Sequence, residues 1–160
     1  METVRIGNQE WTARNLDIVV PDSWDYGDDP ANREKYGRLY TWEAAKKAVE
    51  SLGDGWRLPN GEDWDALIEA VGGKGVAGTK LKAKSGWDAD GNGTDDYGFS
   101  ALPNGGRNTG GGFWGVGSFG YWWTATESNS NSAWYRSMHY VLVRDSYDMS
   151  NGFSARCLRD

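Results

Sequence analysis

The sequence has few of the aliphatic side chains from which most protein cores are built. Leucine, isoleucine, valine and phenylalanine together make up 25 of the 160 residues. With a net charge of −6, so low a share is typical of disordered chains. The 10 tryptophans and 8 tyrosines change that interpretation, because each large ring can bury roughly 150–250 Å². We therefore expect a folded domain whose core is built largely on aromatic rings.

Long apolar runs and paired cysteines are also missing. No segment has the roughly 20 apolar residues that a membrane-spanning helix needs, so we expect no membrane insertion. Cys157 is the single cysteine and His139 the single histidine, which excludes a Cys/His metal cluster and an intrachain disulfide. We expect a buried, structural Cys157 and an exposed His139. No enzyme signature remains, and we predict a protein that is not an enzyme.

Lysine is absent from residues 101–160, which contain five arginines, and the whole chain is acidic. A chain without a basic stripe lacks the phosphate contacts that nucleic-acid binding requires, so we expect no nucleic-acid partner. The same 60 residues contain eleven aromatic residues, eight serines and five asparagines. Such a composition is typical of protein-binding surfaces. The alternative is a glycine-rich β region that happens to lack lysine.

The order of the predicted elements indicates an α+β domain over residues 1–160. Short strands are expected near both ends of the chain, and residues 21–36 are expected to form an ordered loop. Two helices are predicted, one following Thr41 and one following Asn60, because both residues can act as N-caps. Glycine dominates residues 72–120, and strands follow at 121–126 and 133–143. We therefore predict two helices, long ordered loops and a small, mostly antiparallel sheet in which the termini pair.

One acidic loop resembles the start of a calcium-binding loop. Asp88, Asp90, Asn92 and Asp96 occupy positions that supply oxygen ligands in such loops. Phe99 stands where a bidentate glutamate belongs, and no pair of helices is predicted around the loop. A turn capped by its own side chains is the alternative, so calcium is only a possible cofactor.

Six strings, taken together, resemble the Fibrobacter succinogenes major paralogous domain family. They follow the family's order over essentially the whole chain: VRIGNQEW (Val4–Trp11), KYGRLYTWEAAKKA (Lys35–Ala48), GWRLPN (Gly55–Asn60), GNGTDDYGFSALP (Gly91–Pro103), GYWWTATE (Gly120–Glu127) and SNGFSARC (Ser150–Cys157). The resemblance implies a C-type-lectin-like fold. Relatives often carry cysteines at positions that correspond here to Asp25, Arg33 and Val49. It therefore also implies a free, buried Cys157 packed near Val49.

A region of about residues 114–150 is asparagine-rich in relatives but diverse here, and resembles the variable region of a diversity-generating retroelement protein. In such proteins, template adenines are randomised during reverse transcription. An asparagine codon treated in this way cannot encode Trp, Lys, Glu, Gln or Met. None of these occurs at the positions that we take as candidate ligand-binding residues: Phe119, Ser128, Ser130, Ser132, Tyr135, Ser137, His139, Val141, Leu142, Asp145, Ser146, Tyr147 and Asp148. The alternative is ordinary drift on an exposed surface.

Alternation along a strand would place these candidates together. Tyr135, Ser137, His139 and Val141 would share one face, and Trp134, Arg136, Met138 and Tyr140 the other. Exposed Val141 and Leu142 would then form an apolar centre ringed by Tyr135, His139 and Tyr147. These expectations favour a monomeric or weakly oligomeric binding protein for a protein or cell-surface ligand, located on a cell or virion. Two alternatives are a structural or adhesive cell-surface module without a diversified site, and an enzyme related to formylglycine-generating proteins. The chain lacks the cysteine pair that the oxidation carried out by such enzymes would need.

Overall fold

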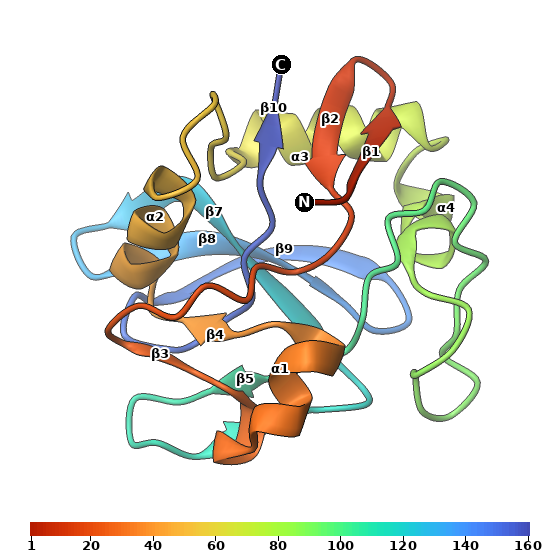
Figure 1. The fold of residues 1–160 in the computed structure, drawn as a ribbon. Helices are drawn as coiled ribbons and strands as arrows, with labels where there is room; N and C mark the ends of the chain where they lie inside the picture. Colours follow the sequence, from red (N-terminus) through yellow and green to blue (C-terminus); the bar gives the residue numbers. More distant parts are fainter.

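The two ends of the chain meet in one small sheet. The structure is a computed structural model that covers residues 1–160. Strand β1 (Thr3–Ile6) pairs antiparallel with β2 (Gln9–Thr12), and β10 (Leu158–Arg159) pairs antiparallel with the other edge of β2. The N- and C-terminal strands therefore belong to one sheet, with β2 between them (Figure 1). The predicted pairing of the termini is confirmed.

Both predicted helices are present and begin at the predicted caps. Helix α2 (Trp42–Glu50) follows Thr41, whose hydroxyl accepts a hydrogen bond from the Ala44 amide at 3.3 Å. Helix α3 (Gly61–Ala70) begins with a capping box in which the side chains of Asn60 and Asp63 each accept from the other's amide, both at 2.8 Å. These local contacts explain why the sequence alone located both helices.

Two further α-helices occupy segments that were expected to be loops, so the prediction of two helices was too low. Helix α1 (Pro30–Tyr36), which follows the 3₁₀ turn η1 (Tyr26–Asp28), begins where the Asp29 side chain accepts from the Ala31 amide at 3.0 Å. Helix α4 (Lys74–Leu81) is rich in glycine and therefore has no clear helical period. None of the helices is long and apolar enough to cross a membrane.

One of the two glycines of α4, Gly78, lies against another part of the backbone, whereas Gly75 faces open space. A β-carbon on Gly78 would lie 3.4 Å from the Leu142 amide nitrogen and 3.7 Å from the Val141 α-carbon. These are ordinary contact distances, so α4 packs at Gly78 directly against the backbone that begins the last strand of the main sheet. Helix α4 thus owes its position to tertiary packing, which the sequence pattern does not reveal.

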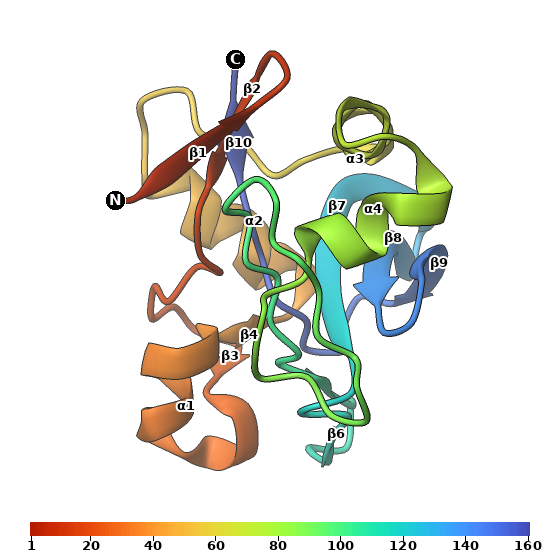
Figure 2. The same cartoon turned by 90° about the vertical axis from the view of Figure 1, so that its right-hand side faces the viewer.

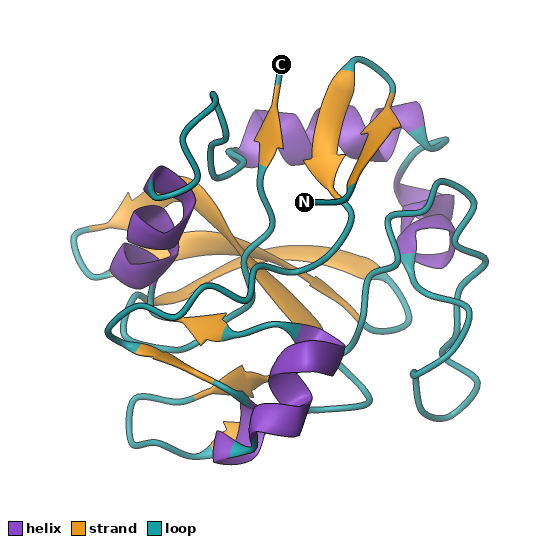
Figure 3. Cartoon of the chain, in the orientation of Figure 1, coloured by secondary structure: helices purple, strands orange, loops and turns teal.

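The largest sheet, drawn in orange across the middle of Figure 3, has the strand order β7-β8-β9 and is antiparallel throughout. It consists of β7 (Gly120–Asn129), β8 (Ser132–Met138) and β9 (Leu142–Asp148). The remaining strands form two short antiparallel pairs. Strand β3 (Ser23–Trp24) pairs with β4 (Leu39–Tyr40), and β5 (Gly106–Arg107) pairs with β6 (Phe113–Trp114). The fold is therefore α+β, with four α-helices and several small antiparallel sheets.

Each face of the β7-β8-β9 sheet contributes to a different apolar cluster. On one face, Trp122 and Met138 are buried with Trp64 of α3, and α3 and α4 lie on this side of the sheet (Figure 1). On the other face, Trp123 and Ala133 are buried in a cluster that contains residues of α2. Rings carry much of both clusters, as the composition predicted. A side chain's position in the strand alternation thus decides which cluster it joins.

Cys157 is free and buried in the same apolar cluster as Val49. This placement confirms the expectation of a free, buried Cys157 and puts it in the cluster that contains Val49. Burial raises the pKa of the Cys157 thiol to about 12, so the thiol stays protonated near neutral pH. Because the thiolate is the reactive form of cysteine, Cys157 is a packing residue here.

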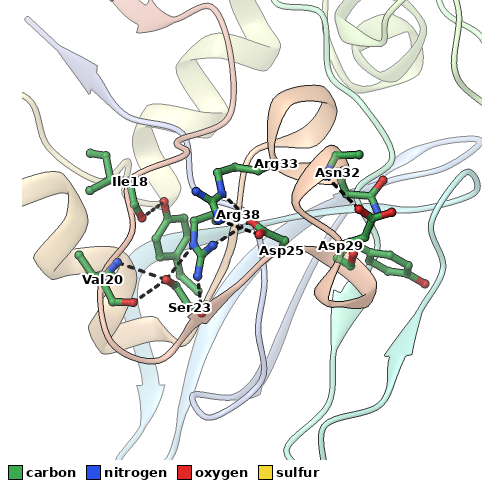
Figure 4. A network of polar contacts seen from close by, with 11 residues as sticks. Ile18, Val20, Ser23, Asp25, Asp29, Asn32, Arg33 and Arg38 are labelled. Carbon is green, nitrogen blue, oxygen red and sulfur yellow. Dashed lines mark hydrogen bonds and ion pairs between the residues drawn. The ribbon is translucent and has the colours of Figure 1, made fainter.

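An ion-pair network fixes the segment that precedes α1 (Figure 4). The Arg33 guanidinium donates two hydrogen bonds of 2.8 Å to the Asp25 carboxylate. The Arg38 guanidinium donates to the same carboxylate at 2.8 Å and to the Ser23 hydroxyl at 3.0 Å. Asp25 and Arg38 are both buried. Thus an ion pair joins Asp25 and Arg33, two of the three positions at which the resemblance implied cysteines in relatives.

Candidate functional site

The register of the β7-β8-β9 sheet gathers aromatic side chains on one face. Tyr135 is paired with Trp123 of β7 and with Asp145 of β9, and Ser137 is paired with Tyr121 and Val143. Paired residues point to the same side of a sheet. The surface that results, which we call the aromatic face, comprises Phe119, Tyr121, Tyr135, Ser137, Val143, Asp145 and Tyr147.

A buried ring, Phe153, supports this face from below. Its side chain is 1% exposed, and its ring centroid lies 4.9 Å from that of Tyr121, 5.0 Å from Tyr135 and 6.3 Å from Tyr147. Two backbone hydrogen bonds between Phe153 and Tyr40 of β4, of 2.8 and 2.9 Å, hold the segment that carries the ring. The tyrosines of the face are therefore ordered by packing before any ligand arrives.

The rings of the aromatic face are half-buried or exposed and keep polar atoms available. Tyr147 is 51% exposed, and the Tyr121 and Tyr135 side chains are half-buried. Burial raises the pKa of the Tyr135 phenol to about 12, and the Asp145 carboxylate adds to the shift. The pKa of Tyr121 is raised by burial as well. Both phenols therefore stay protonated, and each can present a hydroxyl group beside a large apolar surface.

The structure brings together only some of the candidate ligand-binding residues. Five of them, Phe119, Tyr135, Ser137, Asp145 and Tyr147, lie on the aromatic face. His139 and Val141 lie in the turn between β8 and β9, where the His139 ring is 5.1 Å from that of Phe119. This turn is therefore continuous with the aromatic face.

The other candidates lie elsewhere on the sheet. Ser128 and Ser130 are at the turn between β7 and β8, and Ser132 is paired with Asp148 beside that turn. Ser146 is paired with Trp134 on the opposite face of the sheet. These residues therefore lie near the β7–β8 turn or on the face of the sheet opposite Tyr135, and not beside the β8–β9 turn.

Leu142 also departs from the expected arrangement. It is paired with Met138 and packs, partly buried, against the cluster under α3 and α4. The expectation that Val141 and Leu142 form one exposed apolar centre was therefore wrong. The chain turns at residues 139–141, so β9 begins at Leu142 with its side chain toward the core, whereas Val141 remains 55% exposed in the turn. Trp134, Arg136 and Met138 do share the face opposite Tyr135, as predicted.

Sequence reasoning missed Tyr121 and Val143. Tyr121 falls in the family string GYWWTATE and was not among the candidates, yet its ring stacks on Phe119 at 6.0 Å with an interplanar angle of 15°. Val143 is 38% exposed opposite Ser137. The pairing of Tyr121 with Ser137 depends on two register shifts between Trp123 and Asn129, which the sequence pattern does not reveal.

The acidic loop from Asp88 to Asp96 uses its side chains to hold turns. The Asn92 side-chain oxygen accepts from the Trp87 amide at 3.0 Å, and the Asp95 carboxylate accepts from the Ser100 amide at 2.8 Å. No three side chains of the His, Cys, Asp and Glu types come together anywhere in the chain as a group that could hold a metal ion.

A cavity of about 670 Å³ lies apart from the aromatic face, between the N-terminal residues, α1 and residues 98–102. In Figure 2, α1 and strands β8 and β9 are on opposite sides of the molecule. Basic and acidic side chains both line the cavity, among them Arg14, Asp17, Glu34 and Lys35. None of the candidate ligand-binding residues does, so the cavity and the aromatic face are two separate surfaces.

Comparison with known proteins gives one match. The family profile described as the Fibrobacter succinogenes major domain matches residues 4–159, which is almost the whole chain. No curated protein and no solved structure matches it. The matched span includes every string on which the resemblance was based. The chain therefore belongs to the Fibrobacter succinogenes major domain family.

Proposed function

We propose that this chain is a non-enzymatic binding protein whose aromatic face, together with the β8–β9 turn, recognises a protein or cell-surface ligand. The observation that carries the proposal is the cluster of Tyr121, Tyr135 and Tyr147 around the buried Phe153. Tyrosine offers a large, rigid and amphipathic contact surface at a low cost in conformational entropy. Rings fixed by packing before binding are the usual anchors of protein interfaces.

Two features support a role without catalysis. Cys157 is buried, and its amide and the Thr12 hydroxyl are 3.2 Å apart, whereas His139 lies in the β8–β9 turn. The His139 ring nitrogen Nδ1 accepts a hydrogen bond from the Tyr140 amide. The strongest nucleophile and the only imidazole thus lie in different parts of the fold, and each has a structural role.

We further propose that the exposed candidates are diversified, as the resemblance to diversity-generating retroelement proteins implies. Five candidates lie on the aromatic face and two in the adjoining turn. Trp123 is buried on the same side of the sheet, and Trp122 and Met138 are buried on the opposite side. A lectin-like scaffold of this kind can vary one surface and keep its core.

Sequencing this gene from many cells of one population tests the diversification. We expect substitutions confined to the candidate codons, and a reverse transcriptase gene close by with an adenine-biased template repeat. A uniform gene without that neighbour would leave the alternative, a structural or adhesive module of the same family with no diversified site.

Replacing Tyr147 with alanine should abolish most binding and leave the fold intact. Peptides selected from a random display library on the immobilised chain would serve as ligands, with dissociation constants measured by calorimetry. Loss of an interface anchor costs at least about 2 kcal/mol, or roughly 30-fold in affinity. Because Tyr147 is 51% exposed, its loss should change the free energy of unfolding by less than about 1 kcal/mol.

Tyr97 provides a matched control, since it is also an exposed tyrosine but lies in a loop outside the aromatic face. The Tyr97→Ala variant should bind the selected peptides as the unmodified chain does. Peptides that tolerate Tyr147→Ala but lose affinity for Tyr97→Ala would place the binding surface elsewhere and refute the proposal.

A further inference from the structure

The aromatic face carries two carboxylates that form no ion pair, although the Lys82 ammonium donates to the His139 carbonyl in the adjoining turn. Asp145 is exposed, lies directly opposite Tyr135, and takes part in none of the ion pairs of the structure. Glu127, which is paired with Ala133 near the far end of the same face, is also exposed and outside every ion pair. The Asp145 carboxylate accepts a hydrogen bond from the Ser146 amide at 2.8 Å, but neither carboxylate has a cationic partner, and both border a surface of half-exposed rings.

The nearest basic groups on the sheet are engaged elsewhere. The Arg144 guanidinium, although next to Asp145 in sequence, lies 4.6 Å from the centre of the Trp134 ring on the opposite face. The buried Arg136 guanidinium donates to the Asp65 carboxylate at 3.1 Å. No lysine or arginine of β7, β8 or β9 therefore faces the same side as Asp145, and the uncompensated charge is a property of this surface.

Rings and a carboxylate side by side suit one kind of ligand group. A cation over a tyrosine ring is attracted by the negative face of the π system, and a carboxylate within reach adds a charge-assisted hydrogen bond. Asp145 and Tyr147 are two residues apart on β9 and point the same way, and the Tyr135 ring lies opposite Asp145. A guanidinium is well matched because it can stack on a ring and pair with a carboxylate at the same time.

We propose that the ligand of the aromatic face is a protein segment that inserts an arginine or lysine side chain between Tyr135 and Tyr147 and pairs it with Asp145. This inference rests on the proposed function and names the chemistry of the partner. The aliphatic stem of the inserted residue packs on the rings while its charged end reaches the carboxylate. The net charge of −6 adds long-range attraction for a basic partner, and this attraction weakens as salt is added.

A titration with a defined probe tests the proposal. N-acetyl-arginine methylamide is added to the isotopically labelled chain, and N-acetyl-norleucine methylamide serves as the uncharged control. We expect the arginine probe to shift the amide signals of Tyr135, Asp145 and Tyr147 in NMR spectra, with several-fold smaller shifts at high salt. In the Asp145→Asn variant these signals should shift at least about fivefold less, whereas in Asp96→Asn, which changes an exposed aspartate outside the aromatic face, they should shift as in the unmodified chain.

The outcomes separate this inference from the proposed function. The proposal of a basic partner would be overturned by any of three results. These are equal shifts with the uncharged control, no shifts at all, and unchanged shifts in the Asp145→Asn variant. If the selected peptides still depend on Tyr147 in that case, the aromatic face remains the binding surface for a ligand of another chemistry. If the peptides do not depend on Tyr147, the proposed function itself fails, whatever the arginine probe does.

Discussion

Replacing Phe153 with alanine is expected to lower the free energy of unfolding by about 3–5 kcal/mol, the usual cost of removing a buried aromatic ring. The same change should lower the affinity of the chain for the selected peptides, although Phe153 itself is buried and would not contact them. Its ring centroid lies 4.6 Å from that of Trp123 and 4.9 Å from that of Tyr121. Without this ring, the tyrosine side chains can move into the space that it leaves. Urea denaturation and calorimetry, both at a temperature where the variant is folded, measure the two effects.

Phe153→Leu is the matched control for this experiment. It keeps most of the buried volume, so it should cost less than about 1.5 kcal/mol of stability and preserve most of the peptide affinity. If Phe153→Ala remains folded and binds the peptides with undiminished affinity, the rings do not owe their arrangement to the support of Phe153. The claim that the aromatic face is ordered from below would then be wrong.

Replacing Asp25 with alanine should have a second large effect, a loss of about 3–5 kcal/mol. Removing one partner of a buried ion pair leaves the other charge buried without compensation, and Arg38 is as buried as Asp25. Arg33→Ala is the control, because the Arg33 side chain is 38% exposed and an exposed partner contributes about 1 kcal/mol or less. Equal losses in the two variants would show that Arg38 does not depend on Asp25.

The pH dependence of stability follows from the same ion pair. Hydrogen bonds from Arg33, together with the positive charges of Arg38 and Arg33, hold the pKa of Asp25 below its usual value. A carboxyl with a lowered pKa in the folded state stabilises the fold above its unfolded pKa of about 3.9, and the effect is lost as the pH falls through the folded value. The free energy of unfolding should therefore fall as the pH is lowered from 5 to 2, and it should fall less in the Asp25→Asn variant than in the unmodified chain.

Local signals were enough to predict part of this fold. The helix starts at Thr41 and Asn60 could be predicted because each cap bonds to an amide three residues away. The terminal strands and the Cys157–Val49 neighbourhood followed from the order of the strings and from the family resemblance. In each case the decisive contact lies within one turn of helix or follows from a known order of elements.

The remaining features depend on contacts between distant parts of the chain. Helix α4 lies where Gly78 meets the backbone at Val141 and Leu142, a contact that leaves no periodic signal in a glycine-rich segment. The places of Tyr121 and Leu142 depend on the register between strands and on the exact residues of one turn. A shift of one residue reverses which face a side chain occupies, so the candidate site was predicted as a region but not as a surface.

Amide hydrogen exchange, with and without a selected peptide, tests the central claim most directly. If the aromatic face is the binding surface, peptide addition should slow exchange in residues 119–121 and 133–147 and leave residues 12–18 and 33–37, beside the 670 Å³ cavity, unchanged. Slower exchange centred on residues 12–18 and 33–37, with none in β8 and β9, would show that the cavity binds the ligand and would contradict the account.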